Sequence, residues 1–309
     1  MPRDLVGYGP NPPRVRWPND ARVALSIVVN FEEGSEQSVT DGDPQAEGLG
    51  EVQYPMPPGI PDLANESIYE YGMRVGIWRV LKVLAKHEAK ATFFMCAQAM
   101  ERYPEAARAA HQAGHELISH GYRWEEYFRM SREQEQERIQ LTIRAFERVV
   151  GQRPLGWYCR YGPSVNTREL VVEEGGFLYD SDAYNDELPY WVEVQGTQHL
   201  VVPYNLDVND IRFWLGPAFN TGSEFDAYCR ETLDQLYEEG AELPRMMSVG
   251  LHPRIIGRPG RIGGLDRFLA YARSRPGVWL ATREQIARVW REQFPPSGRL
   301  GAAWGARGG

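Results

Sequence analysis

The sequence has little of what marks exported or membrane-bound proteins. Its 309 residues include only three cysteines, Cys96, Cys159 and Cys229, and their odd number and wide spacing predict reduced thiols rather than disulfides. No apolar stretch approaches the roughly 20 residues that a membrane-spanning helix needs. Residues 1–20 are rich in proline and glycine and lack the apolar centre of a signal peptide. We therefore expect a cytoplasmic protein that does not enter a membrane.

Basic residues are also too scattered for a nucleic-acid-binding protein. The formal net charge is −8, and no long run of lysine or arginine occurs. No Gly-x-Gly-x-x-Gly pattern follows the first apolar run, which argues against a dinucleotide-binding fold. What the chain does have is 42% hydrophobic residues, enough for a well-buried globular core. The expected partner is a small-molecule substrate rather than a nucleic acid.

Short apolar runs alternate with amphipathic segments, the pattern of a mostly parallel sheet covered by helices. Strands are expected at residues 22–31, 91–97, 115–120, 155–160, 177–181, 199–203, 246–252 and 278–281. Helices are expected at residues 67–84, 104–112, 132–150, 167–174, 225–239, 265–272 and 283–290. We predict a single catalytic domain over residues 1–293, with an N-terminal arm (1–20) and a long polar loop (35–65). The glycine-rich segment 294–309 is predicted to be a disordered tail.

Polar residues stand at the points where several of the predicted strands end. They are Asn30, Glu32, His120, Arg160 and His252. In barrels of parallel strands, the residues that carry chemistry gather at the carboxyl ends of the strands. The sequence therefore predicts one site formed by these distant positions.

Adjacent carboxylates and two histidines are the candidates for acid–base chemistry. Glu32 and Glu33 could act as a base or as metal ligands, and crowding them would raise the pKa of one. His120 and His252 are suited to carrying protons near neutral pH. The alternative interpretation is a solvated glutamate pair and two histidines that serve only as hydrogen-bonded polar groups.

Arginines and aromatic residues complete the predicted site. Arg160 is expected to orient the catalytic acid or base through a bidentate pair. Arg258 lies in a Gly-Arg-Pro-Gly-Arg run and could present a cation to a carboxylate or an oxyanion, or be solvated on a surface loop. Tyr122 and Trp124 follow His120 closely, and Trp191 either lines the pocket or packs in the core.

Taken in order, these motifs resemble the polysaccharide-deacetylase superfamily over residues 5–293. The similarity is closest to the allantoinases of that superfamily, with which the chain shares the segments at residues 4–9 (DLVGYG), 119–124 (SHGYRW) and 175–182 (GGFLYDSD). The resemblance implies a distorted, incomplete (β/α) barrel, hydrolysis of a carbon–nitrogen bond, and a homotetramer.

The sequence departs from that of the sugar deacetylases of the superfamily. The resemblance to those enzymes would imply an Asp-His-His metal site with a second aspartate as base. Trp124 stands where their second histidine falls, and an indole cannot ligate a metal. Either Asn30 and Glu32 or Glu32 and Glu33 replace the aspartate pair. Glu32 and His120 alone fall short of the three protein ligands of catalytic zinc. We therefore predict no metal ligands and no cofactor, with zinc or another divalent metal as the disfavoured alternative.

The predicted activity is ring opening of a cyclic amide, most specifically (S)-allantoin to allantoate. Glu32 or His120 would activate water, and His252 would protonate the leaving nitrogen. The substrate-contacting residues would be Asn30, Glu33, Tyr122, Trp124, Trp191 and Arg258. The alternatives are a cyclic imide or hydantoin-type hydrolase, a metal-dependent N-acetyl sugar deacetylase, and an inactive barrel used for binding.

Overall fold

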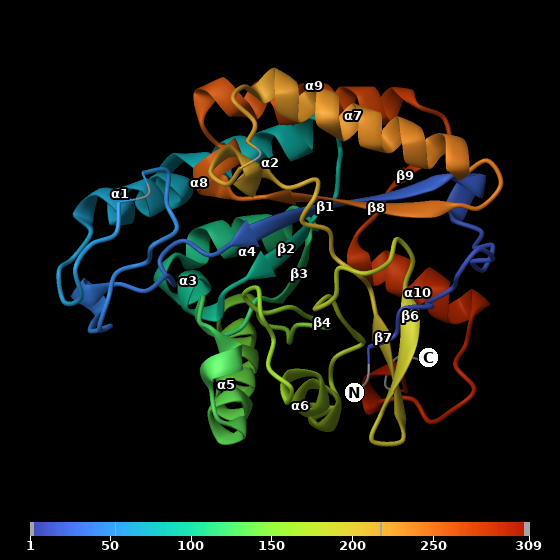
Figure 1. Cartoon of the computed structure of the whole chain (residues 1–309), viewed down its shortest axis with the longest axis horizontal. Coiled ribbons are helices and arrows are strands. Elements are labelled where there is room, and N and C mark those ends of the chain that lie inside the picture. The colour runs from blue at the N-terminus through green and yellow to red at the C-terminus, as the bar shows by residue number, and fades with distance from the viewer. Residues whose placement is uncertain (1–2, 53, 217, 306–309) are drawn as a thin grey trace.

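The computed structural model describes residues 3–52, 54–216 and 218–305, and these form an α/β fold around one curled sheet (Figure 1). The sheet has nine strands in the order β6-β7-β5-β4-β3-β2-β1-β8, with β9 paired to β1. The β6–β7 pair is antiparallel and every other described pairing is parallel. The predicted α/β fold, a distorted and incomplete (β/α) barrel, is confirmed.

The longest strands are β1 and β8, which lie side by side, and the other strands are short. Their bounds are β1 Val23–Phe31, β2 Thr92–Met95, β3 Glu116–Ser119, β4 Gly156–Trp157, β5 Tyr179–Asp180, β6 Tyr190–Val194, β7 Thr197–Val201, β8 Arg245–Leu251 and β9 Val278–Leu280. All nine residues of β1 are buried, as expected for a central parallel strand that is covered on both faces and rich in valine and isoleucine.

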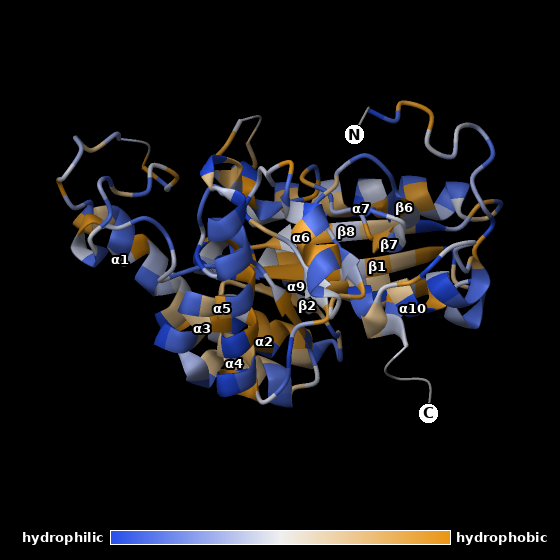
Figure 2. Ribbon diagram, turned by 90° about the horizontal axis from the view of Figure 1, so that it is seen from below, coloured by the Kyte–Doolittle hydropathy of each residue, from blue (hydrophilic) through white to orange (hydrophobic). Residues whose placement is uncertain are grey.

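Helices cover the outside of the curled sheet, and α7 and α9 run side by side across it (Figure 1). Their bounds are α1 Leu63–Tyr71, α2 Ile77–Lys86, α3 Ala97–Arg102, α4 Pro104–Gln112, α5 Arg132–Val150, α6 Thr167–Glu174, α7 Gly222–Glu239, α8 Pro253–Ile256, α9 Pro259–Ser274 and α10 Arg283–Gln293. Hydropathy follows this layering, because apolar residues line the interior and hydrophilic residues lie outside (Figure 2). No described helix is long and apolar enough to cross a membrane.

The single helix expected at residues 67–84 is divided into α1, a π-helical turn η3 (Gly72–Gly76) and α2. The helical stretch begins earlier than predicted, because Asp62 rather than Ser67 caps it by accepting a hydrogen bond from the Asn65 backbone at 2.9 Å. π-Helical turns often occur at functional sites, and this one lies against α8.

The part of the predicted disordered tail that the structure describes packs against the body of the protein. Trp304, in the 3-10 helix η6 (Ala302–Trp304), is buried, and its ring centroid lies 6.2 Å from that of Trp191. The Gln198 backbone also donates a hydrogen bond to the Arg299 carbonyl at 2.7 Å. A large indole therefore anchors a segment whose glycine content suggested disorder. Residues 306–309 lie outside the described residues.

The register of the sheet brings its carboxyl ends to one edge. Phe31 is paired with Met95, Met95 with Ser119, and Val29 with Leu251. The residues that follow β1, β3 and β8 therefore emerge close together. This edge faces the viewer's left in Figure 1, where the loop after β1 and helix α1 project from the body.

Candidate active site

Glu32, His120 and His252 meet at this edge of the sheet. Glu32 Oε1 lies 3.0 Å from His120 Nε2 and 3.6 Å from His252 Nε2. All three side chains are buried, with at most 6% of any residue exposed. A carboxylate between two imidazoles is an arrangement that can accept and donate protons.

Asp210 holds His252 in position, a role that the sequence did not reveal. Asp210 lies in the 3-10 helix η5 (Asp210–Phe213), and its Oδ1 lies 2.6 Å from His252 Nδ1. Its Oδ2 accepts backbone hydrogen bonds from His252 at 2.7 Å and from Ile256 at 3.1 Å. With Nδ1 bound to Asp210, His252 directs Nε2 toward Glu32.

Arg254 is the second residue of the site that sequence reasoning missed. Its guanidinium NH2 donates to Glu32 Oε2 at 2.7 Å, and its NH1 lies 3.5 Å from Glu33 Oε1. Its backbone N–H also donates to Glu33 Oε1 at 2.9 Å. The side chain is fully buried. The two glutamates are therefore joined to helix α8 by one arginine.

Two glycines of η3 allow α8 to approach this closely. A Cβ atom at Gly72 would lie 2.4 Å from Glu33 Oε1, and one at Gly76 would lie 2.0 Å from the Pro253 carbonyl oxygen. Any other residue at either position would displace the acidic pair or the start of α8. Glycine is thus needed at positions 72 and 76 because the site packs closely against them, and not because the helix needs glycine there.

The charges of this cluster shift the pKa values of Glu32 and His252 in opposite directions. Burial acts to raise the pKa of Glu32, but the charges of Arg254 and His252 outweigh it and hold that pKa well below its usual value. Burial acts to lower the pKa of His252, but the charges of Glu32 and Asp210 raise it to about 9. Near neutral pH, Glu32 is therefore ionised and His252 is protonated.

Arg160 makes the bidentate pair that was predicted, but with a different partner. Its NH1 and NH2 donate to the Glu47 carboxylate at 2.8 and 3.1 Å, and its guanidinium lies 3.8 Å from the Trp124 ring centroid. The prediction that Arg160 orients the catalytic acid or base is thus corrected, because the loop after β1 supplies the carboxylate. Arg160 instead ties that loop to the mouth of the site.

Asn30 and Glu33 lie buried beneath the site rather than at its opening. The Asn30 amide donates to the Tyr204 hydroxyl and to the Leu251 carbonyl, each at 3.2 Å. Both Asn30 and Glu33 are buried and bound to protein groups, and their role as substrate contacts stays a prediction. Tyr204 packs beside Tyr158, whose ring centroid lies 4.9 Å from that of His120.

The side chains of three other predicted substrate contacts interact with partners other than Glu32 and the two histidines. The Tyr122 hydroxyl donates to Glu101 at 3.1 Å, and the Arg258 guanidinium covers the Tyr71 ring at 3.7 Å. The Trp191 indole donates to the Phe294 carbonyl at 2.8 Å. Tyr122 turns toward α3, Arg258 is the N-cap residue of α9, and Trp191 lies on the edge strand β6.

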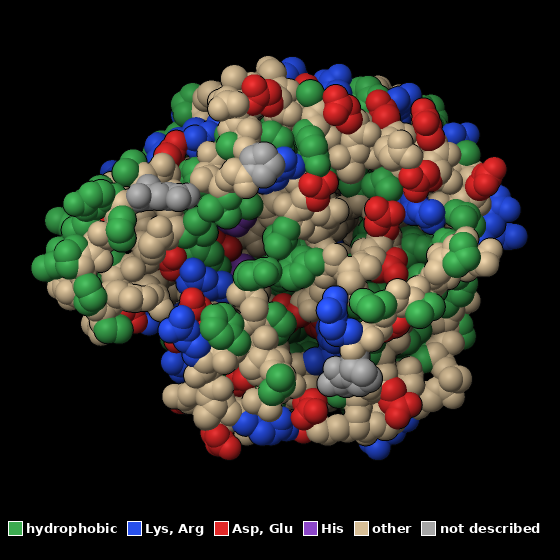
Figure 3. Space-filling model, viewed as in Figure 1, with side chains coloured by type: hydrophobic (Ala, Val, Ile, Leu, Met, Phe, Trp, Pro, Cys, Tyr) green, Lys and Arg blue, Asp and Glu red, His purple; other side chains and the backbone are tan. Residues whose placement is uncertain are grey.

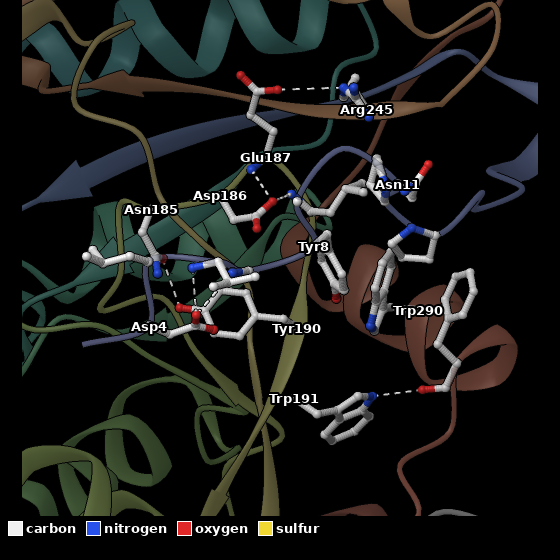
Figure 4. Close-up of a pocket in the computed structure, with 18 of the residues that line it drawn as sticks. Asp4, Tyr8, Asn11, Asn185, Asp186, Glu187, Tyr190, Trp191, Arg245 and Trp290 are labelled. Atoms are coloured by element: carbon white, nitrogen blue, oxygen red, sulfur yellow. Dashed lines mark hydrogen bonds and ion pairs between the residues drawn. The ribbon is translucent and has the colours of Figure 1, made fainter. Parts of the chain in front are cut away.

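Trp191 lines a separate cavity of about 1050 Å³ between the N-terminal arm and helix α10 (Figure 4). The Tyr8 hydroxyl closes one side by donating to the Pro189 carbonyl at 2.6 Å. Neither Glu32 nor the two site histidines line this cavity. On the face that holds the carboxyl edge, the space-filling view shows histidine side chains within a hollow, beside acidic and hydrophobic groups (Figure 3).

The donor set does not fit a divalent metal. Among the described residues, no group of three or more histidine, cysteine, aspartate or glutamate side chains is placed to hold one. Trp124 is buried near the cluster and offers no lone pair, and the Arg254 guanidinium occupies Glu32 Oε2. A metal would have to displace a positive charge from the carboxylate that it needs.

Comparison with known proteins agrees with this architecture. Residues 67–179 match the family Polysaccharide deacetylase. A Schizosaccharomyces pombe protein named as a polysaccharide deacetylase is 39% identical over 315 residues, which cover 95% of this chain and 98% of the relative. The peptidoglycan deacetylase of Helicobacter pylori is 32% identical over 63% of this chain and 65% of its own length. The chain belongs to the polysaccharide deacetylase family and is a hydrolase of that family.

Two solved structures are similar to this chain over nearly its whole length. A Pseudomonas aeruginosa PAO1 structure, named as that of a polysaccharide deacetylase, superposes with a TM-score of 0.92 at 49% identity and covers 96% of this chain and 100% of its own. The crystal structure of Puue allantoinase has a TM-score of 0.92 at 47% identity, with 96% and 99% of the two chains covered.

Proposed function

We propose that this protein opens the ring of (S)-allantoin by hydrolysing a ring amide bond to give allantoate. The observation that carries the proposal is the cluster of Glu32, His120 and His252, whose side chains can act as acid and base. Among the described residues, no group of three or more potential ligands is placed to hold a metal ion. The likeness to Puue allantoinase, at 47% identity over 96% of the chain, supports this substrate.

The first step is attack by water on the ring carbonyl. Glu32 is ionised and accepts a proton from the water as its oxygen bonds to the carbonyl carbon. His120 lies 3.0 Å from the same carboxylate oxygen and fixes its direction. A tetrahedral oxyanion forms at the former carbonyl.

The second step is departure of the ring nitrogen. His252 is protonated near neutral pH and gives its Nε2 proton to the nitrogen as the carbon–nitrogen bond breaks. Asp210 stabilises the imidazolium before transfer and keeps the ring in place afterwards. The proton held by Glu32 then passes across the 3.6 Å to His252 Nε2, which restores both groups, and the carboxyl product releases its own proton to solvent.

The test is release of allantoate from allantoin by the purified chain, before and after treatment with EDTA. We expect turnover in both cases, and a loss of about 10²-fold or more in kcat for Glu32→Gln. Absence of allantoin turnover would reject the substrate. Loss of activity on chelation, with recovery on adding zinc, would reject a metal-independent reaction.

A second candidate is deacetylation of an N-acetyl sugar, because several relatives bear the name of deacetylases. The donor set around Trp124 and Arg254 argues against it. A panel of allantoin, hydantoin, a cyclic imide and an N-acetylglucosamine oligomer, each assayed with and without zinc, separates the candidates. Preferential turnover of the oligomer with zinc would favour the second candidate.

A further inference from the structure

A buried arginine side chain lies under the proposed reaction centre with both acidic residues of the motif around it. The Arg254 guanidinium lies 2.7 Å from Glu32 Oε2 and 3.5 Å from Glu33 Oε1. The exposed fraction of the Arg254 side chain is 0%, and those of the two glutamates are 2% and 0%. Two buried carboxylates and one buried cation therefore form a compact unit.

Aromatic rings enclose the remaining sides of this cation. The guanidinium carbon lies 4.3 Å from the Tyr69 ring centroid and 5.4 Å from those of Trp124 and Trp214. Ring faces attract a guanidinium without competing for the carboxylates, so they hold it where it lies. The enclosure comes from α1, from the segment after β3 and from the segment after η5, which are distant in sequence.

We propose that Arg254 is a built-in cation that takes the position of a divalent metal at the base of this site. It positions Glu32 rather than touching the substrate, since its side chain is fully buried behind that carboxylate. One guanidinium neutralises the acidic pair and fixes Glu32 Oε1 toward His120 and His252. The catalytic part of this inference rests on the proposed function, but its structural part does not.

This arrangement explains why a tryptophan stands at position 124. An indole face attracts the guanidinium. An indole also has no lone pair that could ligate a metal, so Trp124 suits an arginine rather than a metal ion at this place. Arg254 and Trp124 therefore act together, and exchanging only one of them should not create a metal site.

The experiment measures binding of Co²⁺, an optical substitute for zinc, by absorption spectroscopy and calorimetry in the absence of substrate. Wild type and Trp124→His should not bind it. The double variant Trp124→His/Arg254→Ala should bind it, because removal of the guanidinium frees Glu32 and Glu33 beside two imidazoles. Since loss of Arg254 leaves an acidic pair uncompensated, Trp124→His/Arg254→Gln provides a second version that keeps polar contacts to both carboxylates.

The matched control is Trp124→His/Arg283→Gln. Arg283 is also fully buried, but its guanidinium donates to Ser181, Ser248 and backbone carbonyls rather than to a carboxylate. This control should not bind Co²⁺. Equal binding by Trp124→His alone, or no binding by either double variant that circular dichroism shows to be folded, overturns the proposal.

Activity provides an independent readout. With the Trp124 side chain retained, Arg254→Lys should keep part of kcat because the charge remains, and Arg254→Gln should lose at least 10²-fold in kcat with little change in KM. Equal kcat in both variants overturns the positioning role. If wild type does not hydrolyse allantoin, the proposed function fails, but the Co²⁺ result still decides whether Arg254 occupies the metal position.

Discussion

At the scale of single residues, the site depends on a pair of groups with opposite pKa shifts. Glu32 is held ionised and His252 is held protonated because each lies in the field of the other, with Arg254 and Asp210 on their far sides. Neither state would persist if one partner were buried alone, since burial opposes charge on both. The acid–base assignment of the proposed reaction follows from this coupling.

The pH dependence of kcat/KM should therefore be bell-shaped and broad. Activity requires protonated His252, so it should fall as pH rises through about 9. It also requires ionised Glu32, so the acid limb should lie below the usual glutamate value. His252→Asn should reduce kcat by about 10²- to 10⁴-fold and remove the alkaline limb. A variant that retained the limb near pH 9 would show that another group supplies the acid.

The same pair should make stability depend on pH. The folded-state pKa of His252 is raised to about 9 from 6.5, so its contribution to stability is complete below pH 6.5 and lost as pH rises through about 9. The shift corresponds to about 3 kcal/mol. Urea unfolding at pH 6 and pH 10 should show a difference between wild type and His252→Asn that shrinks by roughly this amount. A constant difference would contradict a raised pKa.

The position of a site residue relative to the strands decides whether the sequence alone could predict it. Glu32, His120 and His252 directly follow strands, and parallel register brings such positions together. Asp210 follows no predicted strand, and Arg254 lies inside the short helix α8. Their importance comes from long-range contacts with residues distant in sequence, for which a single sequence contains no local signal.

At the scale of elements, the pair between Glu47 and Arg160 ties the loop between β1 and α1 to the segment that follows β4. The Arg160 and Glu47 side chains are 17% and 5% exposed, and the loop projects from the body in both ribbon views (Figures 1 and 2). The Arg123 guanidinium makes a second bidentate pair with Asp43 of this loop. Two paired arginines therefore hold a segment that has little regular structure.

Loss of the Arg160–Glu47 pair should impair substrate binding more than chemistry. Arg160→Met and Glu47→Gln should each raise KM for allantoin by about tenfold, equivalent to about 1.4 kcal/mol, with kcat changing less. Steady-state kinetics measures this, and limited proteolysis should show faster cleavage within the loop. Arg102→Met is the control, since its pair with Asp41 is more exposed and should contribute little. If the control raises KM equally, the loop rather than this pair is responsible.

Element boundaries were predictable where local signals were strong. Helix α5 has the predicted bounds because Ser131 and Gln134 form a capping box and Gly151 adopts a left-handed conformation at its end. Strand β6 was not predicted, because its hairpin with β7 depends on pairing across the Gln195–Gly196 turn rather than on an apolar run. Short edge strands therefore require tertiary context.

At the scale of the whole molecule, the segments at both ends of the chain pack against the sheet. The N-terminal arm reaches the β8 side, where the Trp17 indole donates to the Arg245 carbonyl at 3.0 Å. The C-terminal segment reaches β7, where Leu300 forms a bridge with Gln198. An incomplete barrel leaves strand edges open, and these end segments cover part of them.

Removal of the Trp304 side chain should therefore destabilise the protein without affecting its chemistry. Trp304 is 5% exposed, packs against Trp191, and receives the Arg291 guanidinium 4.6 Å from its ring centroid. Trp304→Ala should lower the free energy of unfolding by about 3 kcal/mol, the lower end of the range for large aromatic truncations in cores.

Urea unfolding measures this loss, and kcat at saturating allantoin should remain unchanged because Trp304 packs against Trp191 and Arg291 rather than at the proposed active site. The control is Leu5→Ala on the opposite arm, where the side chain is 80% exposed and the cost should be within about 0.5 kcal/mol. A tail that is disordered in solution predicts no loss for either variant. Equal stability of wild type and Trp304→Ala would therefore show that the C-terminal segment does not pack on the sheet.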